Sequence, residues 1–279
     1  MPYSINLKGK LIDLSTPLVM GILNVTPDSF YEKSRTTTEE SILSRVKEII
    51  DEGATIIDIG AYSSRVNAEH ISEDEEMRRL SAALEIILNE YPDAIISIDT
   101  FRSGIAKKCV EEFGVAIIND ISGGELDKNM FETVAELQVP YILMHMKGTP
   151  QNMAENTDYK HLLQEIFYYF SEKINRLHLL GVNDIIIDPG FGFAKDLNQN
   201  YELLSHLSDF RIFDHPLLVG ISRKSMIYKL LGITSDESLN GTTVLNTIAL
   251  MSGAHMLRVH DVKAAIEAVK IIEKMKQSN

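Results

Sequence analysis

The chain has 279 residues, a formal net charge of −13 and a sequence pI near 5.1, a balance that argues against a nucleic-acid or membrane surface as partner. Hydrophobic residues make up 44% and charged residues 24%, as in an ordinary globular protein. The single cysteine, Cys109, excludes an intramolecular disulfide and any multi-cysteine metal site. Its helical surroundings favour a core residue over a catalytic thiol. Since no leader-like or long apolar segment is seen, we expect a cytoplasmic protein.

The predicted elements begin with a small hairpin in residues 1–17, which we expect to plug one end of the fold. Short runs of Ile, Val, Leu and Met then recur along the chain, and each stops on a polar residue. Runs of this length suit parallel strands that are buried on both faces. The polar stops are Asn24, Asp58, Asp99, Asn119 with Asp120, His145, Asp188, Ser222 to Lys224, and Arg258 with His260.

Segments with helical periodicity separate these runs, at residues 38–52, 72–91, 101–113, 129–138, 158–181, 198–209, 239–252 and 261–276. Ser72 and the pair Thr157-Asp158 are predicted N-caps. Strands that alternate with helices imply parallel βαβ units, and eight such units predict one (β/α)8 barrel domain over residues 1–279. Residues 24–37 and 60–71 follow strands without a helical pattern, so we expect them to be functional loops.

The strand-end residues around Asp188 indicate a site for a flat nitrogen heterocycle, because a (β/α)8 barrel carries its active site at the carboxyl ends of its strands. Asp188, followed by Pro189, can accept two parallel hydrogen bonds from an N–C–N edge. Asn119 could satisfy the neighbouring positions of the heterocycle or could close a loop, and a loop role is open for Asp120 as well. Lys224 beside Asp188 would stay protonated and could bond a carbonyl oxygen and a ring nitrogen.

The loops after the seventh and eighth predicted strands indicate an anion site. Arg258 and His260 lie two residues apart and therefore share one face of the strand. An Arg fork with a His donor suits phosphate or pyrophosphate. Ser222 adds a hydroxyl on the same rim, whereas Arg223 must point elsewhere because it adjoins Lys224.

The remaining stops are less specific. Asn24 offers a neutral oxygen that is consistent with Mg²⁺, which usually keeps several waters and bridges substrate phosphates. Asp58 and Asp99 are isolated carboxylates that could stabilise positive charge or act as a base. His145 has a methionine on each side, one of them Met144, and these could line a flat ring or simply pack in the core. Together, the stops are consistent with a reaction of the form heterocycle–CH₂–O–diphosphate plus a nucleophile, and they do not choose the heterocycle.

At this level of detail the chain resembles the dihydropteroate synthase family of folate biosynthesis. The segments that carry the resemblance appear in the family's order and span nearly the whole chain: MGILNVTPDSF, SIDT, INDISGG, LMHMKGTP, DPGFGFAKDLNQNYELL, GISRKSMI and LRVHDVK. The resemblance implies a Mg²⁺-dependent condensation of 6-hydroxymethyl-7,8-dihydropterin diphosphate with 4-aminobenzoate. The products would be 7,8-dihydropteroate and pyrophosphate, formed by a dissociative (SN1-like) mechanism in a homodimer.

The resemblance also implies roles for individual residues, carried over by motif. The pterin would contact Asp99, Asn119, Met144, Asp188 and Lys224. The diphosphate would contact Asn24, Arg258 and His260, with Asn24 also binding Mg²⁺. The 4-aminobenzoate would contact Ser64, Arg65, Phe193 and Ser222. The catalytic residues would be Asp99, which stabilises the cation, together with Lys224, Arg258 and His260.

One segment departs from the family pattern. Family members commonly read GGESTRPG where this chain reads GAYSSRVN, residues 60–67. Ser64 and Arg65 keep their chemistry, but Val66-Asn67 replaces Pro-Gly and so removes a fixed φ and a permissive glycine. We therefore expect altered handling of sulfonamides, which compete for the 4-aminobenzoate subsite.

Three other classes of protein are alternatives to this interpretation. A corrinoid-dependent, pterin-binding methyltransferase shares the fold and the pterin contacts but would not need MGILNVTPDSF or the anion site. A non-catalytic pterin-binding paralogue predicts losses among Asn24, Arg258 and His260, and all three are present. A sugar-phosphate isomerase would need a proton-transfer pair near the phosphate, which is not evident.

Overall fold

The strands form a closed barrel. The computed structural model describes residues 3–25, 35–62 and 70–278, without the side chains of residues 35–38. In these ranges the parallel strands are β3 (Leu18–Asn24), β4 (Ile56–Gly60), β5 (Ile96–Asp99), β6 (Ile117–Asp120), β7 (Tyr141–Met144), β8 (Ile185–Asp188), β9 (Leu218–Val219) and β10 (Met256–Val259). They are hydrogen-bonded in the order β8-β7-β6-β5-β4-β3-β10-β9. Ile187 in β8 pairs with Leu217 just before β9, so the two ends of this order meet and the predicted (β/α)8 barrel is confirmed.

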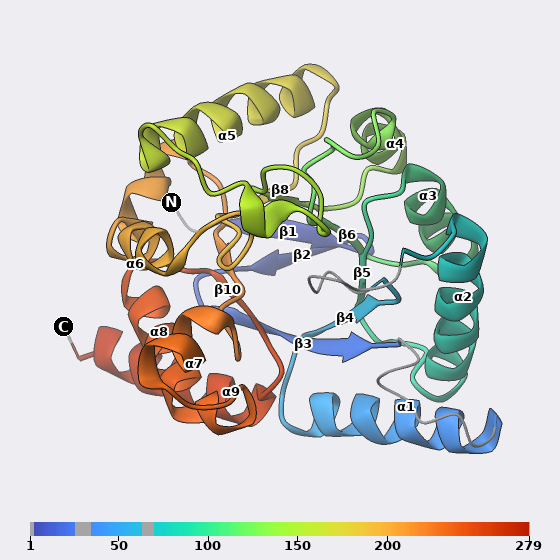
Figure 1. Cartoon of the computed structure of the whole chain (residues 1–279). Coiled ribbons are helices and arrows are strands. Elements are labelled where there is room, and N and C mark those ends of the chain that lie inside the picture. Colours follow the sequence, from blue (N-terminus) through green and yellow to red (C-terminus); the bar gives the residue numbers. More distant parts are fainter. Residues whose placement is uncertain (1–2, 26–34, 63–69, 279) are drawn as a thin grey trace.

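Helices form the outer ring of the barrel (Figure 1). Their bounds in the described ranges are α1 (Arg35–Asp51), α2 (Glu73–Glu90), α3 (Ser103–Phe113), α4 (Met130–Leu137), α5 (Leu162–Leu179), α6 (Leu197–Ser205), α7 (Ser225–Leu231), α8 (Leu239–Met251) and α9 (Val262–Lys276). Short 3-10 helices lie at η2 (Met153–Glu155), η3 (Leu207–Phe213) and η4 (Asp236–Ser238). Most of the predicted helices are confirmed to within a few residues.

The differences from prediction lie at helix boundaries. Ser72 caps α2 as expected, accepting from the backbone N–H of Glu75 at 3.2 Å. The predicted cap at Thr157-Asp158 is wrong, because Glu165 from inside α5 accepts from the N–H groups before that helix, at 2.8 and 3.3 Å. α6 ends at its C-cap His206, and η3 follows in place of further α-helix. Helix α7 was not predicted, since its seven residues are too few to show a helical period.

The strands alternate between two surroundings. Residues such as Val19, Ile57 and Ile118 face outward and pack in the main core beneath the helices. Inward-facing residues at the amino-terminal end of the barrel form a second apolar cluster with three residues of the N-terminal segment: Ile5, Leu7, Leu14, Met20, Ile56, Ala116, Ile117, Ile142, Ile186, Leu218 and Met256. The hairpin of β1 (Ser4–Leu7) and β2 (Lys10–Asp13) thus closes this end, as predicted. The barrel interior is therefore apolar at its amino-terminal end.

Cys109 lies in α3 and is fully buried in the main core. Burial raises the pKa of its thiol to about 12, so this residue is a core residue, as predicted. Across the described residues, none of the helices is both long and apolar enough to span a membrane.

Candidate active site

Polar side chains converge at the carboxyl ends of the strands, inside the barrel. Side chains at alternate positions of a strand lie on the same face. Asp99, Asn119 and Asp188 therefore point into the barrel from the carboxyl ends of β5, β6 and β8. The register supports this, since Asp99 pairs with Asn119 on neighbouring strands and Met144 pairs with Asp188. The strand-end residues predicted to meet around one ligand therefore do meet.

Arg258 is the centre of this group. Its Nε donates to Oδ2 of Asp58 at 2.6 Å, and its Nη2 donates to Oδ2 of Asp99 at 2.7 Å. Asn119 donates from Nδ2 to the same oxygen of Asp58 at 3.1 Å. Burial raises the pKa of Asp99 to about 7, although the guanidinium of Arg258 opposes the rise. Asp99 and Arg258 remain partly accessible, with side chains 18% and 20% exposed, so a ligand at the mouth can reach them.

Asp58 does not end its strand, and this part of the prediction is wrong. β4 continues to Gly60, so Asp58 lies one layer deeper in the barrel and its side chain is fully buried. At this depth it cannot act as a base at the mouth. Its contacts with Arg258 and Asn119 give it a positioning role, because they fix the angle at which both side chains face the mouth.

Lys224 lies at the same mouth, next to Asp188 and near Arg258. Its Nζ donates to the carbonyl oxygen of Phe191 at 2.5 Å and lies 4.6 Å from the ring centroid of Phe193. Burial lowers the pKa of Lys224 to about 8 and raises that of Asp188, while attraction between the two charges opposes both shifts. Asp188 is held by the backbone N–H of Gly190, which donates to Oδ1 at 2.8 Å. This pair offers an acceptor and a donor to one flat ligand.

Ser222 and His260 form a third group on the rim. Ser222 Oγ accepts from the backbone N–H of His260 at 3.1 Å and lies 3.1 Å from its Nδ1. Burial lowers the pKa of His260 to about 4, helped by repulsion from Arg258, so the imidazole is neutral near pH 7. Arg45 of α1 donates to the carbonyl oxygen of His260 at 2.5 Å, a contact that no sequence pattern indicated.

Asn24 ends β3 beside this network. Its Oδ1 lies 3.6 Å from the point that a Cβ on Gly60 would occupy, and Asp99 lies at a similar distance from that point. Among the described residues, no group of three or more His, Cys, Asp or Glu could hold a metal ion. A divalent cation at Asn24 would therefore take most of its ligands from substrate phosphates and water. Mg²⁺ prefers such an arrangement, so the residues present fit it.

The outward-facing neighbours of these residues have structural partners. Asp120 accepts from Ser122, Gly124 and Tyr141 at 2.7 to 2.8 Å, which confirms a role in its loop. Arg223 binds both carboxylate oxygens of Asp261, at 2.8 and 2.9 Å, and so points away from the mouth, as predicted.

His145 also faces outward and is a core residue. Its Nδ1 lies 3.0 Å from Nζ of Lys195, which donates in addition to the carbonyls of Gly190 and Phe193 at 3.0 Å. Since an ammonium only donates, Nδ1 accepts in this contact. Burial and the nearby lysines hold the pKa of His145 well below its usual range, so the ring is neutral. Lys195 was not predicted, and it fixes the loop that carries Asp188 and Phe193.

An apolar cluster completes the mouth. It contains both methionines that flank His145, and its buried members are Tyr62, Phe101, Ile121, Met144, Met146, Met153 and Ala194. Phe193 packs against it. The cluster offers apolar side chains beside the polar groups. The predicted residues Ser64 and Arg65, and the Val66-Asn67 pair, lie outside the described residues.

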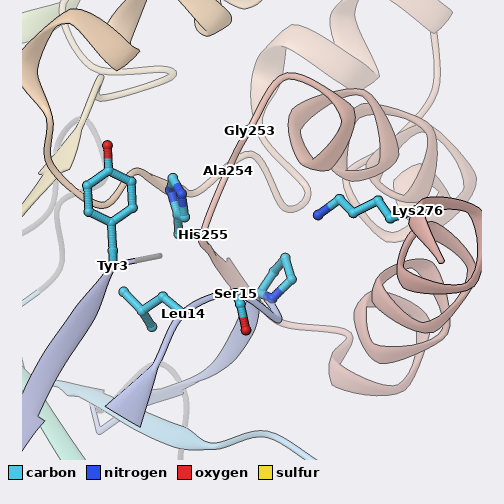
Figure 2. A pocket seen from close by; sticks show the side chains of 8 residues that line it. Tyr3, Leu14, Ser15, Gly253, Ala254, His255 and Lys276 are labelled. Atoms are coloured by element: carbon cyan, nitrogen blue, oxygen red, sulfur yellow. The ribbon is translucent and has the colours of Figure 1, made fainter. Parts of the chain in front are cut away.

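A hollow of about 200 Å³ lies at the other end of the barrel (Figure 2). Its lining comes from the N-terminal segment, the turn before β10 and the end of α9: Tyr3, Leu14, Ser15, Pro17, Gly253, Ala254, His255 and Lys276. None of the inward-facing strand-end residues reaches it. The candidate active site is therefore the polar mouth at the carboxyl ends of the strands.

Comparisons with known proteins identify the class of this barrel. A family model described as "Pterin binding enzyme" matches residues 20–260. Because this model covers most of the chain, the barrel belongs to the class of pterin-binding enzymes.

Individual relatives identify the family within this class of pterin-binding enzymes. Dihydropteroate synthase of Escherichia coli K12 is 42% identical over 271 residues, covering 95% of this chain and 94% of the relative. The crystal structure of Yersinia pestis dihydropteroate synthase with a sulfonamide drug complex has a TM-score of 0.91 at 38% identity, covering 99% of this chain and 100% of that one. The Xanthomonas albilineans enzyme with 4-aminobenzoic acid has a TM-score of 0.90 at 32% identity, covering 99% of each chain. The chain belongs to the dihydropteroate synthase family and is a transferase that transfers a pterin group.

Proposed function

We propose that this chain condenses 6-hydroxymethyl-7,8-dihydropterin diphosphate with 4-aminobenzoate to give 7,8-dihydropteroate and pyrophosphate. The observation that carries the proposal is the convergence of Asp99, Asn119, Asp188, Lys224 and Arg258 on one mouth. Solved relatives support the substrate classes, since one contains 4-aminobenzoic acid and another was obtained in the presence of pteroic acid.

The pterin would lie between the polar and apolar walls of the mouth. Asp188 would accept two hydrogen bonds from the N–C–N edge of the ring, and Lys224 would donate to its carbonyl oxygen and a ring nitrogen. Asn119, held by Asp58, would complete the polar contacts. Met144 would cover a ring face.

The diphosphate would lie over Arg258, His260 and Asn24. In the proposed dissociative mechanism the CH₂–O bond breaks first, and its electron pair leaves with pyrophosphate. Mg²⁺ bound at Asn24 would supply positive charge for the developing pyrophosphate oxygens. Arg258 would supply a guanidinium N–H, and neutral His260 would donate a hydrogen bond without changing its charge.

The ion pair between Arg258 and Asp99 would link departure of pyrophosphate to stabilisation of the pterin cation. The guanidinium lies 2.7 Å from the carboxylate before reaction. As charge builds on the leaving group, Arg258 would turn part of its hydrogen bonding from Asp99 to pyrophosphate. Asp99 would then face the pterin methyl cation with its negative charge less compensated, at the moment when the cation needs it.

The arylamine would attack from the side of Phe193 and Ser222. Its nitrogen forms the new C–N bond with the cation and then loses a proton. A weakly basic aniline needs no adjacent general base for this attack, because the electrophile is already a cation. Ser64 and Arg65 are proposed for the same side on the strength of their motif. A pocket of this kind would also accept sulfonamides, one of which is bound to the Y. pestis relative.

The experiment that tests the proposed function is incubation of the purified chain with the pterin diphosphate, 4-aminobenzoate and Mg²⁺. We expect pyrophosphate and dihydropteroate in equal amounts, and loss of both products when a chelator removes the metal. Pyrophosphate release without dihydropteroate, or no turnover at all, would contradict the proposal.

Sulfonamide handling is a separate proposal that rests on Val66-Asn67. Pro-Gly at these positions would restore a fixed φ and a permissive residue. We expect the double variant Val66→Pro/Asn67→Gly to change the ratio of sulfonamide Ki to 4-aminobenzoate KM by a factor of about 2 to 5, equivalent to the roughly 0.4–1 kcal/mol typical of such backbone changes. An unchanged ratio would rule out this proposal while leaving the reaction intact.

We also propose a homodimer that forms through the C-terminal helices. Val244, Ile248 and Met251 lie on one face of α8 and are 50%, 39% and 60% exposed. Ile271 and Met275 of the neighbouring helix α9 are 67% and 47% exposed. Such an apolar face is typical of a subunit interface. Sedimentation should give twice the chain mass for the wild type and the chain mass for Met251→Glu, and a monomeric wild type would refute the dimer.

A further inference from the structure

Ser222, in the loop after β9, contacts His260 at two atoms. Its Oγ accepts from the backbone N–H of His260 at 3.1 Å and lies 3.1 Å from Nδ1 of the imidazole. Arg45 of α1 holds the same residue at a third atom, because its Nη2 donates to the carbonyl oxygen of His260 at 2.5 Å. The main chain and one ring nitrogen of His260 therefore have partners. Among the side chains that the structure describes, none is hydrogen-bonded to the other ring nitrogen, Nε2.

An ion pair joins the same two segments outside the mouth. Arg223 follows Ser222, Asp261 follows His260, and Arg223 binds both carboxylate oxygens of Asp261 at 2.8 and 2.9 Å. A bidentate pair of this kind fixes the geometry between its partners. The backbones that carry Ser222 and His260 are thus held together independently of the Ser222 hydroxyl.

Only one placement of the protons gives both side chains a partner. The imidazole of His260 is neutral near pH 7 and carries one N–H. Because Oγ of Ser222 already accepts from the backbone N–H, its own proton is available for Nδ1, which then accepts. If Nδ1 carried the proton instead, the hydroxyl of Ser222, which is 4% exposed, would have no acceptor among the described residues. A buried donor without a partner is costly, so the ring proton belongs on Nε2.

We propose that Ser222 is a positioning residue that holds His260 in its Nε2–H tautomer. Arg258 and His260 lie two residues apart at the end of β10, so the imidazole is on the same inward face as the guanidinium. An Nε2–H group donates to an anion at the mouth, whereas the other tautomer would present a lone pair to it. The inference rests on the proposed function, in which the diphosphate lies over Arg258 and His260. It gives Ser222 a role on the diphosphate side of the site in addition to its place beside the arylamine.

The first test reads the tautomer of His260 from the nitrogen-15 shifts of its ring by NMR near pH 7. The variant His260→Gln identifies the signals by their loss. We expect a neutral ring with its proton on Nε2 in the wild type, both alone and with Mg²⁺ and pyrophosphate. In Ser222→Ala the Nδ1–H tautomer should become populated, because Nδ1 has lost its donor. Ser222→Thr keeps a hydroxyl and should restore the wild-type spectrum.

Steady-state kinetics tests whether Ser222 acts through His260. We expect Ser222→Ala to lower kcat/KM for the pterin diphosphate by a factor of about 3 to 10, as for the weakening of one hydrogen bond. In the His260→Gln background the same substitution should add less than about twofold, because the group through which it acts is gone. The control is Ser122→Ala, which removes a fully buried hydroxyl that donates to the outward-facing Asp120 at 2.7 Å. It should leave kcat/KM and the His260 spectrum unchanged.

An Nδ1–H or charged ring in the wild type would overturn the inference, and so would an unaltered tautomer in Ser222→Ala. A loss of kcat/KM that persists in full in the His260→Gln background would contradict it as well. If Ser222→Ala does not fold, Ser222→Cys takes its place, since a thiol is a weak donor. The spectrum needs no turnover, so an Nε2–H ring in a wild type that makes no dihydropteroate would remove the proposed function and leave the tautomer assignment standing.

Discussion

Asn119 and Asp120 are neighbours at the end of β6, and they lie on opposite sides of the barrel wall. Asn119 faces inward and binds Asp58 at 3.1 Å, so it belongs to the polar mouth. Asp120 faces outward, where Ser122, Gly124 and Tyr141 occupy its oxygens. Both are buried polar residues at the same strand end. What separates a ligand contact from a loop contact here is the face of the strand and not the residue type.

The lysines around the loop after β8 repeat this contrast. Lys224 faces the mouth, where its pKa falls to about 8, and lies beside Asp188 and Phe193. Lys195 lies on the other side of the same loop, where its pKa falls to about 7, and binds His145 and two backbone carbonyls. Burial is the main cause of both shifts. A perturbed pKa at a strand end is therefore not sufficient evidence of a catalytic group.

The largest expected effect is the difference in kcat/KM between substitutions of Arg258, which faces the mouth, and of Arg223, which points away from it. Arg258→Ala should lower kcat/KM for the pterin diphosphate by a factor of about 100 to 1000, the usual cost of losing one group that stabilises a developing anion. Binding of a pterin that lacks phosphate should change much less. Arg223→Ala should instead lower the free energy of unfolding by about 1–2 kcal/mol through loss of its bond to Asp261.

Because Arg258→Ala leaves the buried Asp58 without its cation, Arg258→Lys is the second variant. It keeps the charge and loses the fork, so kcat/KM should still fall while the chain folds. Steady-state kinetics and denaturant unfolding of the three variants provide the comparison. If Arg223→Ala lost as much kcat/KM as Arg258→Ala while remaining folded, the division between inner and outer residues would be wrong.

A smaller effect should distinguish Lys224 from Lys195, because we expect Lys224 to govern the pH dependence of kcat/KM and Lys195 the pH dependence of stability. Protonated Lys224 would donate charge-assisted hydrogen bonds to the pterin, and deprotonation removes the charge and one N–H donor. We therefore expect kcat/KM to fall as pH rises through the Lys224 pKa of about 8. Lys224→Arg should remove this alkaline fall, because a guanidinium does not deprotonate. An alkaline fall that persists in Lys224→Arg would assign it to another group.

Lys195 should affect stability instead. Its folded pKa is about 7 and its ordinary value is 10.5. Between these values the unfolded chain binds more protons than the folded chain, so the free energy of unfolding should rise with pH. The part of this rise between pH 7 and 8 should be lost in Lys195→Met, because Lys224 starts to contribute only above its pKa of about 8. Urea unfolding at pH 7 and pH 8 measures this difference.

The period of two in a strand made much of the site predictable. Once Asp188 is placed inward, Asn119, Asp99, Met144 and Arg258 follow from the parity of their runs and the closure of the barrel. Asp58 is the exception, because its polar side chain marks the end of the apolar run although β4 continues for two more residues, to Gly60.

The positioning contacts were not predictable in this way. Arg258 and Asp58 are 200 residues apart in the sequence, and Arg45 and His260 are 215 apart. Such pairs depend on the exact approach of loops that no local pattern describes. Lys195 was missed for a related reason, since a lysine after a Gly-rich turn looks like an ordinary exposed charge until burial places it next to His145.

The most direct test of the account is calorimetric titration of 6-hydroxymethylpterin, without diphosphate, into the wild type, Asp188→Asn and Asp120→Asn. We predict that Asp188→Asn weakens binding about 100-fold, as expected when one bidentate charged contact is lost. Asp188→Asn should weaken binding of the diphosphate substrate by a similar factor. Asp120→Asn should bind the pterin with wild-type affinity and should unfold at a lower urea concentration than the wild type. If Asp188→Asn bound the pterin with wild-type affinity and lost affinity only for the pterin diphosphate, the inward-facing residues would not be the pterin site.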